Sequence, residues 1–466
     1  MKHHFLVMLL LLSATFLHAQ SIHRTACQGN LVRLDNLLQN TTIDSEDSRG
    51  RSLLHWAVAC DRTEVFDHLV QKGIAINAQD HEGATPMHMA IRFERMGFFE
   101  KLVALQPDAS WLTTFGPSLI TKAVMTEQAD FLKKLVTLGV DVNGLNERGS
   151  TPLEIALRIE ANEIATVLSE LGAKPELVRR FSPQGAYLGQ DPPGTISKLF
   201  APNVISTEAS EFGSVFNKAS DELYYAVDVN GKNEIRFTKK RFDGTWSPPV
   251  VLLAHDRYGY NDPFLSPDEQ RLYFISKRAF DGEGDLKDQD IWYIERTKKG
   301  WSSPINVGPN INSDRNEYYI SFAQDGSLYF SSNSNAPEDR VRSDYDLYKA
   351  EFVDGGFKKA EPLPGWVNTE AYEADVFVDP QERYLIFCGM LADGYGRGDL
   401  YISFKTEQGQ WTKALNMGAS INSLHHELCP FVTHDGNYLF YTSKQDIYWV
   451  GTEIIEELRK KALGKQ

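Results

Sequence analysis

Residues 83–90 read Gly-Ala-Thr-Pro-Met-His-Met-Ala, and residues 149–156 repeat the pattern as Gly-Ser-Thr-Pro-Leu-Glu-Ile-Ala. A related stretch, Gly-Arg-Ser-Leu-Leu-His-Trp-Ala, occupies residues 50–57. The stretches start 33 or 66 residues apart, and a fixed period of this length indicates stacked structural units. Proline directly after Thr85 and Thr151 suits the first turn of a helix, where its missing N–H costs least. The first third of the chain is therefore predicted to be a helical solenoid.

These stretches resemble the ankyrin-repeat motif Gly-x-Thr-Pro-Leu-His-x-Ala, and the resemblance covers about residues 22–175. The unit that starts at Gly116 lacks the Thr, the Pro and the His. The resemblance implies a stack of helix pairs that binds proteins. It also implies that His55 and His88 hydrogen-bond the backbone, so we expect them to be structural rather than metal ligands.

The same resemblance places a partner-binding surface on the hairpin tips and on the first helix of each repeat. Six residues at these positions are apolar where polar residues are usual, and a contiguous apolar patch marks an interface. The patch is expected to bind either a foreign protein or the second domain of the same chain. The predicted partner-binding residues are Arg92, Phe93, Leu112, Phe115, Met125, Leu145, Arg148, Arg158 and Ile159.

The chain contains four cysteines. Cys27 and Cys60 occupy equivalent points of neighbouring repeats. Stacked helices lie roughly 10 Å apart, whereas a disulfide needs Cα atoms within about 7 Å. Both are therefore expected to be free thiols. Cys388 and Cys429 fall on adjacent units of a second repeat system, and a disulfide between them is left open.

The second repeat system follows a Pro/Gly-rich linker at residues 176–196. Its centre reads Arg-Leu-Tyr-Phe at 271–274, Ser-Leu-Tyr-Phe at 327–330 and Tyr-Leu-Ile-Phe at 384–387. Each copy joins short aromatic-rich strands by tight turns, which is the pattern of a propeller blade. Over residues 197–452 the copies resemble the WD-like repeats of TolB-type β-propellers found in bacterial envelope proteins.

Five copies predict five blades, and six is the alternative because TolB-type rings often have six. The last copy lacks one outer strand, which residues 200–205 can supply to close the ring and remove its open edge. Residues 454–463 are predicted to form a short helix in a terminal segment, 453–466. The predicted fold class is thus a multidomain chain, with an ankyrin-repeat helical solenoid followed by an all-β propeller.

One position of the blade repeat is predicted to lie at the mouth of the central channel. A ring of carboxylates there concentrates negative potential and suits a ligand or a hard cation. The other interpretation, which we favour, is that these residues are structural and hydrogen-bond a neighbouring blade. The channel-mouth residues are Glu211, Tyr260, Glu317, Glu373, Glu427 and the adjacent His426.

The sequence contains no Gly-x-Ser-x-Gly, His-Glu-x-x-His or Cys-x-x-Cys motif. We therefore expect a non-catalytic binding or scaffold protein, with a protein partner or a peptide or glycan ligand, and with no catalytic residues, cofactor or resident metal. The alternative is a propeller carbohydrate-active enzyme, a lyase or a glycosidase, that uses Glu317, Glu373, Glu427 and His426.

Residues 1–19 are predicted to be a secretory signal peptide. Lys2 precedes a mostly apolar run at residues 5–17, which is shorter than the roughly 20 residues that span a membrane. The chain is therefore expected to be exported to the periplasm or beyond, with no transmembrane segment after cleavage. A formal net charge of -15 argues against nucleic-acid binding, which needs a basic face.

Overall fold

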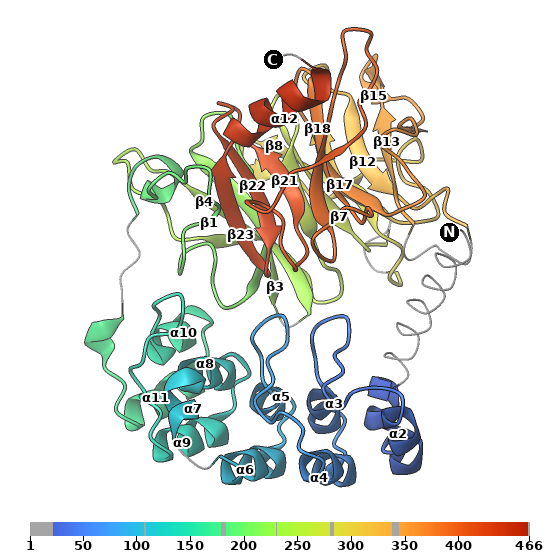
Figure 1. Ribbon diagram of the computed structural model, residues 1–466. Helices are drawn as coiled ribbons and strands as arrows, with labels where there is room; N and C mark the ends of the chain where they lie inside the picture. Colours follow the sequence, from blue (N-terminus) through green and yellow to red (C-terminus); the bar gives the residue numbers. More distant parts are fainter. Residues whose placement is uncertain are drawn as a thin grey trace. The chain divides into compact units, whose positions relative to one another are not determined.

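The computed structural model describes residues 22–106, 109–178, 183–229, 231–279, 284–337 and 344–464 of the 466-residue chain. The chain divides near residue 180 into two compact units, one built of helices and one built mainly of strands (Figure 1). The predicted signal peptide lies outside the described residues. No helix in the described part of the chain has the length and apolar character needed to cross a membrane.

The helical unit is a stack of antiparallel helix pairs. In Figure 1 the first helices of the pairs form one layer and the second helices form another. After a helix at residues 22–28, the helices are α2 (Leu31–Leu38), α3 (Leu53–Ala59), α4 (Thr63–Gln71), α5 (Pro86–Arg92), α6 (Met96–Ala104), α7 (Ser110–Thr114), α8 (Gly116–Met125), α9 (Ala129–Thr137), α10 (Pro152–Arg158) and α11 (Asn162–Glu170).

The motif found in the sequence caps the first helix of a pair and ties it to the next. His88 Nδ1 accepts the backbone N–H of Thr85 at 3.0 Å, which completes a capping box at the start of α5. Its Nε2 lies 2.9 Å from Ser118 Oγ in the following repeat. His55 caps α3 in the same way, and its Nε2 hydrogen-bonds the carbonyl of Ala84 at 2.9 Å. The structural role predicted for both histidines is confirmed.

The third repeat departs from the others, in line with its degenerate motif. The short helix α7 takes the place of the hairpin, so Leu112 and Thr114 lie in a helix rather than on a tip. Gly116 starts α8 and does not adopt the left-handed φ of 74–76° found at the three other motif glycines. A Cβ atom at Gly116 would lie 3.2 Å from the Val140 side chain, so close packing accounts for the glycine here.

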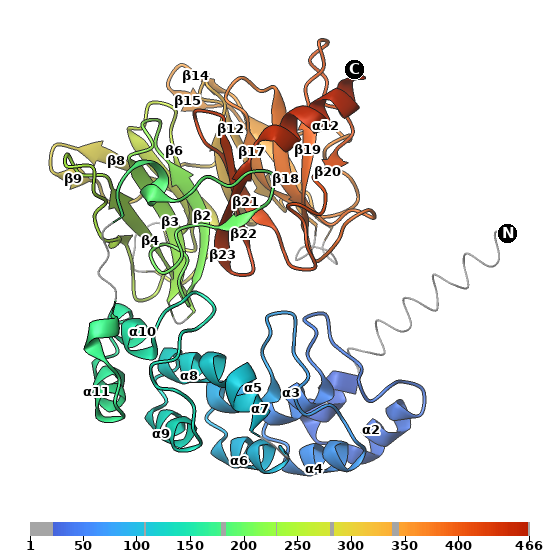
Figure 2. The same ribbon diagram turned by 60° about the vertical axis from the view of Figure 1, so that its left-hand side comes forward.

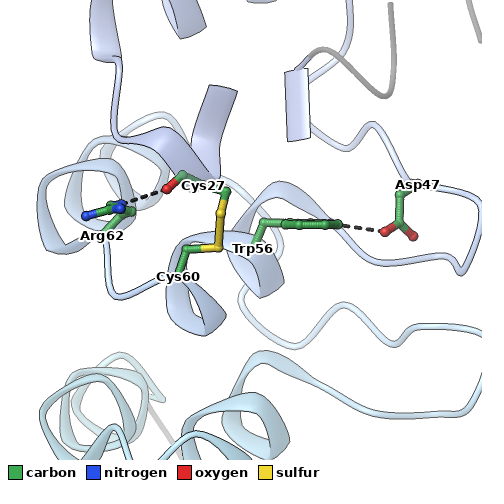
Figure 3. The surroundings of a disulfide bond; sticks show 5 residues. All are labelled: Cys27, Asp47, Trp56, Cys60 and Arg62. Atoms are coloured by element: carbon green, nitrogen blue, oxygen red, sulfur yellow. Dashed lines mark hydrogen bonds between the residues drawn. A yellow bond between two sulfur atoms is a disulfide. The ribbon is translucent and has the colours of Figure 1, made fainter. Parts of the chain in front are cut away.

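Cys27 and Cys60 form a disulfide, so the prediction of two free thiols is wrong (Figure 3). Their Cα atoms lie 5.2 Å apart. The prediction used the distance between helix axes. Each Cα lies about 2.3 Å from its own axis, so Cα atoms on facing sides of stacked helices come within disulfide reach. Arg62 Nε also donates to the Cys27 carbonyl at 2.6 Å, and the first two repeats are joined covalently beside this contact.

The second unit contains five antiparallel sheets of four or five strands, besides a two-stranded one, and the inner strands of these five contact one another in a closed circle. It is a five-bladed β-propeller, not a six-bladed one. From the inner strand outwards, the first blade is β2 (Ser210–Phe216), β3 (Glu222–Val229), β4 (Lys232–Lys239) and β5 (Val250–Leu253), and the second is β6 (Asn261–Leu265), β7 (Arg271–Ser276), β8 (Asp290–Thr297) and β10 (Ile305–Asn306). The third blade is β11 (Glu317–Phe322), β12 (Leu328–Ser332), β13 (Asp346–Ala350) and β16 (Glu361–Pro362), and the fourth is β17 (Glu373–Val378), β18 (Tyr384–Gly389), β19 (Asp399–Phe404) and β20 (Leu415–Asn416). The fifth blade is β21 (Leu428–Val432), β22 (Tyr438–Ser443), β23 (Asp446–Gly451) and β1 (Lys198–Leu199). Short strands β9 (Gly300–Trp301), β14 (Phe352–Val353) and β15 (Gly356–Phe357) extend the second and third blades' outer turns.

A strand from the N-terminal side of the propeller closes the ring. β1 pairs antiparallel with β23, so the fifth blade combines the two ends of the propeller sequence. The backbone N–H of Phe200 adds a hydrogen bond of 2.9 Å to the Ile447 carbonyl. The prediction placed this strand at residues 200–205, two residues too late, but the closure itself is confirmed. The edge of β23 is thereby covered rather than exposed.

The segments that flank the propeller also pack onto it. Within the predicted linker, Tyr187 of the short helix η2 (Ala186–Gly189) is buried against Phe216 and Tyr438, with ring centres 5.3 and 5.0 Å away. At the other end, α12 (Glu453–Leu463) lies against β19 and buries Ile455 and Leu458 (Figure 2). The predicted terminal helix is confirmed.

Candidate functional site

A cavity of about 480 Å³ lies where the five inner strands of the propeller begin. Ligand pockets in proteins fall in the same size range. We call it the channel cavity, because every blade contributes to its wall. It is lined by Phe212, Asn233, Asn261, Asp262, Gln289, Tyr318, Tyr345, Tyr372, Asp375, His426, Leu428 and Cys429.

A backbone feature repeated in all five blades shapes this cavity. Near its start each inner strand has a register shift, and one residue there adopts a φ between 43° and 58°. Residues other than glycine rarely adopt this left-handed conformation, and bulges of this kind redirect a side chain. Such backbone strain, of order 1 kcal/mol per residue, gathers at functional sites. The five bulge residues are Gly213, Asp262, Tyr319, Asp375 and Cys429.

Two bulge residues, in the second and fourth blades, place carboxylates in the channel cavity. Asp262 is 7% exposed and accepts a long hydrogen bond of 3.5 Å from Cys429 Sγ. Burial and the negative charge of Asp375 raise the pKa of Asp262 to about 7. Burial also raises the pKa of Asp375 to about 6, against a hydrogen bond from the Cys429 backbone. Gly213 leaves room for this group, since a Cβ there would lie 2.9 Å from Asp262 Oδ1.

Aromatic rings and an amide complete the wall beside the carboxylates. The rings of Tyr318, Tyr345 and Tyr372 form a continuous arc of edge-to-face contacts, with centres 5.5 and 5.6 Å apart. Gln289 is 9% exposed, and its Oε1 atom has no hydrogen-bond partner among the described residues. A buried acceptor without a donor is uncommon in folded proteins. The cavity is therefore rich in acceptors and in aromatic faces.

The four glutamates predicted for the channel mouth do not line the cavity. Each is at most 1% exposed and accepts hydrogen bonds from a loop residue four positions earlier. Glu317, for example, accepts the N–H and the hydroxyl of Ser313 at 3.2 and 2.6 Å, and the Ser332 hydroxyl at 3.0 Å. The cavity is lined instead by three of the bulge residues, two positions later. The same arrangement joins Glu211 to Thr207, Glu373 to Thr369 and Glu427 to Ser423.

The backbone at this position does bond a neighbouring blade. In all five blades its N–H donates, at 2.8–3.1 Å, to a carbonyl near the start of the preceding blade's third strand. Tyr260 holds this place in the second blade, where its N–H donates to the Asn233 carbonyl at 2.8 Å and its ring is buried. The predicted hydrogen bonds to a neighbouring blade are thus made by the backbone at this position. The carboxylates instead hydrogen-bond the loops that precede them in the sequence.

His426, the sixth predicted channel residue, does line the cavity. Its Nε2 lies 3.3 Å from Cys388 Sγ, and burial lowers the pKa of the ring to about 4. The imidazole is therefore neutral at physiological pH. Cys388 and Cys429 are buried free thiols, so the disulfide left open between them is not formed.

The buried glutamates predict how stability depends on pH. Burial raises the pKa of Glu317 to about 8 and that of Glu373 to about 7, whereas glutamates of an unfolded chain titrate near 4.3. Between these values the folded protein keeps protons that the unfolded chain releases. Its stability from these groups is therefore full below about pH 4 and is lost as pH rises to about 8. Buried histidines with a lowered pKa, such as His426, act in the opposite direction between pH 5.5 and 8.5, so the effect of the glutamates is measured against a variant. Raising the pH from 5.5 to 8.5 is expected to lower the melting temperature of the wild type by roughly 5 °C relative to a variant in which Glu317 cannot ionise.

The matched variant for this measurement is Glu317→Gln, whose side chain is neutral at both pH values. Between pH 5.5 and 8.5 its melting temperature should fall less, or rise more, than that of the wild type, although the variant also loses one acceptor for the Ser313 donors. Glu382 does not interfere, because two lysines and a tyrosine hold its pKa at about 2, below the tested window. The same change in melting temperature between pH 5.5 and 8.5 in the wild type and in Glu317→Gln would contradict this account.

The ankyrin face is the side of the helical unit formed by the loops between pairs and by the first helices α3, α5, α8 and α10. Three predicted partner-binding residues are exposed apolar side chains there: Phe93, Leu145 and Ile159, at 40%, 60% and 36%. Arg92 is exposed beside them, with its guanidinium carbon 5.6 Å from the Phe93 ring centre. Leu157, which was not among the predicted partner-binding residues, is 48% exposed.

The other predicted partner-binding residues are less accessible. Leu112, Phe115 and Met125 are half-buried and pack against the core of the helical unit. Arg148 and Arg158 are half-buried as well, and Arg158 donates to Ser150 Oγ at 3.0 Å. The third repeat thus turns its apolar side chains inward, so the exposed apolar surface is smaller than the sequence predicts.

Comparison with known proteins identifies the repeats of the helical unit. A family model for ankyrin repeats, in three copies, matches residues 22–108. This part of the chain consists of ankyrin repeats. The pairs from α8 to α11 continue the same stack beyond the matched range. A search of curated proteins finds no match to the chain.

Proposed function

We propose that the chain is an exported, non-catalytic binding protein of the bacterial envelope. Its ankyrin face binds a protein partner, and its propeller, of the TolB type, binds a peptide or a glycan at the channel cavity. The observation that carries the first part is the set of exposed apolar side chains at Phe93, Leu145 and Ile159. Apolar side chains exposed in successive units of a repeat scaffold are a common feature of its binding surfaces.

Two features support export. The N-terminal 19 residues have the pattern of a secretory signal peptide, and disulfides persist in the periplasm and outside the cell but are rare in the cytosol. The Cys27–Cys60 disulfide fits that environment. A chain that folds there gains a covalent clamp at the end of its stack, where a terminal repeat has only one neighbour.

The ankyrin face can be tested by affinity capture from envelope extract with the mature full chain as bait. Phe93→Asp and Leu145→Asp are expected to lower recovery of specific partners at least tenfold, because central apolar contacts carry most of the binding energy. Val32→Asp is the matched control, since Val32 is 76% exposed on α2, in the layer of second helices. Equal capture by all three variants would remove the ankyrin face from the proposal.

One observation favours a second candidate, a carbohydrate-active enzyme. Asp262 and Asp375 are cavity carboxylates whose raised pKa values suit general acid and base roles. The glutamates proposed for this role from the sequence are committed to their loops, so the two aspartates replace them. Glycan turnover by the purified chain that is abolished in Asp262→Asn would establish this candidate in place of the binding role.

A further inference from the structure

The two carboxylates of the channel cavity have no cationic partner. Asp262 accepts a long hydrogen bond from Cys429 Sγ, Asp375 accepts one from the Cys429 backbone, and no lysine or arginine of the described residues forms an ion pair with either. The Gln289 Oε1 atom is a third acceptor in the same wall, buried and without a hydrogen-bond partner among the described residues. A buried carboxylate without a positive partner, such as that of Asp262, is unfavourable, so the cavity suits a ligand that donates hydrogen bonds.

The aromatic arc adds a preference for positive charge. The faces of Tyr318, Tyr345 and Tyr372 carry negative electrostatic potential, and cations bind to such faces within about 6 Å of the ring centre. All three rings line the cavity that holds the two carboxylates. The neutral state of His426 keeps an opposing positive charge out of the wall.

We propose that the channel cavity binds a primary ammonium group carried by an organic molecule, such as the end of a lysine side chain. An ammonium group offers three donors and no acceptor, which matches two carboxylates and an amide oxygen. Its apolar stem would lie along the tyrosine rings. This inference rests on the proposed function only in taking the propeller as a binding module, and it names the chemistry that the propeller selects.

The two aspartates are particular to two blades and are not a feature of the repeat. Four of the five bulge residues are not glycine, yet only those of the second and fourth blades are aspartates. Tyr319 instead donates its hydroxyl to the Pro430 carbonyl at 2.8 Å. The strained backbone is thus common to the ring, whereas the charge is placed at two points of it. A carboxylate is not needed for the fold at this position, because three blades do without one.

Isothermal titration calorimetry on the mature full chain tests the proposal. Nα-acetyl-lysine amide is the probe, and Nα-acetyl-norleucine amide, which lacks the ammonium group, is its matched control. We expect one site per chain for the lysine compound and none for the norleucine compound. Cadaverine, a free diamine, is titrated separately. If the natural ligand is a lysine within a peptide, cadaverine should bind more weakly than Nα-acetyl-lysine amide.

Variants assign the binding to the cavity. Asp262→Asn and Asp375→Asn, with unchanged shape, are each expected to weaken binding roughly tenfold or more, because a charge-assisted hydrogen bond is lost. Asp243→Asn, at an exposed turn of the same propeller, should leave it unchanged. The melting temperature of each variant shows that it is folded. Loss of this binding leaves partner capture through Phe93 intact, so the two proposals fail separately.

Three results would overturn the inference. The first is no binding of either ammonium probe at millimolar concentration. The second is equal binding of the lysine and norleucine compounds, which would show that only the apolar stem is recognised. The third is binding of calcium ions or of a neutral oligosaccharide, with no ammonium binding, that is lost in both aspartate variants.

Discussion

Replacing Phe200 by alanine is expected to lower the free energy of unfolding of the propeller by about 3–5 kcal/mol. Phe200 is fully buried where the ring closes. Its ring centre lies 4.9 Å from that of Phe440, 5.3 Å from that of Trp449 and 6.0 Å from that of Phe216. These partners belong to the fifth and first blades, so the substitution leaves a cavity at the one place where the two ends of the propeller meet.

Denaturant unfolding followed by tryptophan fluorescence measures this loss. Phe242→Ala is the matched control, because Phe242 is fully exposed in a turn of the first blade and should change the midpoint little. Equal midpoints for Phe200→Ala and the wild type would mean that the N-terminal strand does not close the ring.

Removing the disulfide is expected to destabilise the first two ankyrin repeats by about 3–4 kcal/mol, the chain-entropy value for a closed loop of this length. The bond joins residues 33 positions apart at the end of the stack, where packing comes from one side only. The double variant Cys27→Ser/Cys60→Ser should therefore unfold its first repeats at lower urea concentration than the oxidised wild type. Hydrogen exchange of the helix at residues 22–28 and of α3 reports this local loss.

Reductant provides the control within one protein. Dithiothreitol should lower the stability of the wild type to that of the double variant and should leave the variant unchanged. Thiol titration in denaturant gives the count directly: two thiols, Cys388 and Cys429, before reduction, and four afterwards. Four reactive thiols before reduction would contradict the disulfide.

The repeated features of the fold could be predicted from the sequence because each of them repeats. A 33-residue period and a Thr-Pro start to a helix leave few alternatives to stacked helix pairs, and the spacing of the Leu-Tyr-Phe strands predicts the blades. Even the closure by a distant strand follows from counting, since the last blade lacks its outer strand. The residues of the closing strand could not be counted in this way, and their prediction began two residues too late.

The residues that line the channel cavity were harder to predict because they differ from one blade to the next. The glutamate that recurs in four blades, such as Glu317, accepts hydrogen bonds from a loop. The cavity is lined instead at the bulge position two residues later. Only Asp262, Asp375 and Cys429 of that position line the cavity, and the residues of the five blades there (Gly213, Asp262, Tyr319, Asp375 and Cys429) share no side-chain chemistry. Only the backbone conformation unites them, and a backbone bulge has no sequence signature when any residue type can occupy it.

The disulfide was missed for a geometric reason rather than a chemical one. The Cα atoms of two neighbouring helices are as far apart as the helix axes only if neither Cα lies on the side that faces the other helix. Cys27 and Cys60 lie at the C-terminal ends of their helices, on facing sides, and their Cα atoms approach to 5.2 Å.

Site-specific photo-cross-linking in living cells tests most directly whether the chain is an exported protein that holds a partner on its ankyrin face. A photoreactive amino acid in place of Phe93 should give a discrete covalent adduct that is recovered with the processed chain in the envelope fraction. The same amino acid in place of Val32, on the layer of second helices, should give none. An unprocessed chain in the cytosol, or equal adducts from both positions, would contradict the account.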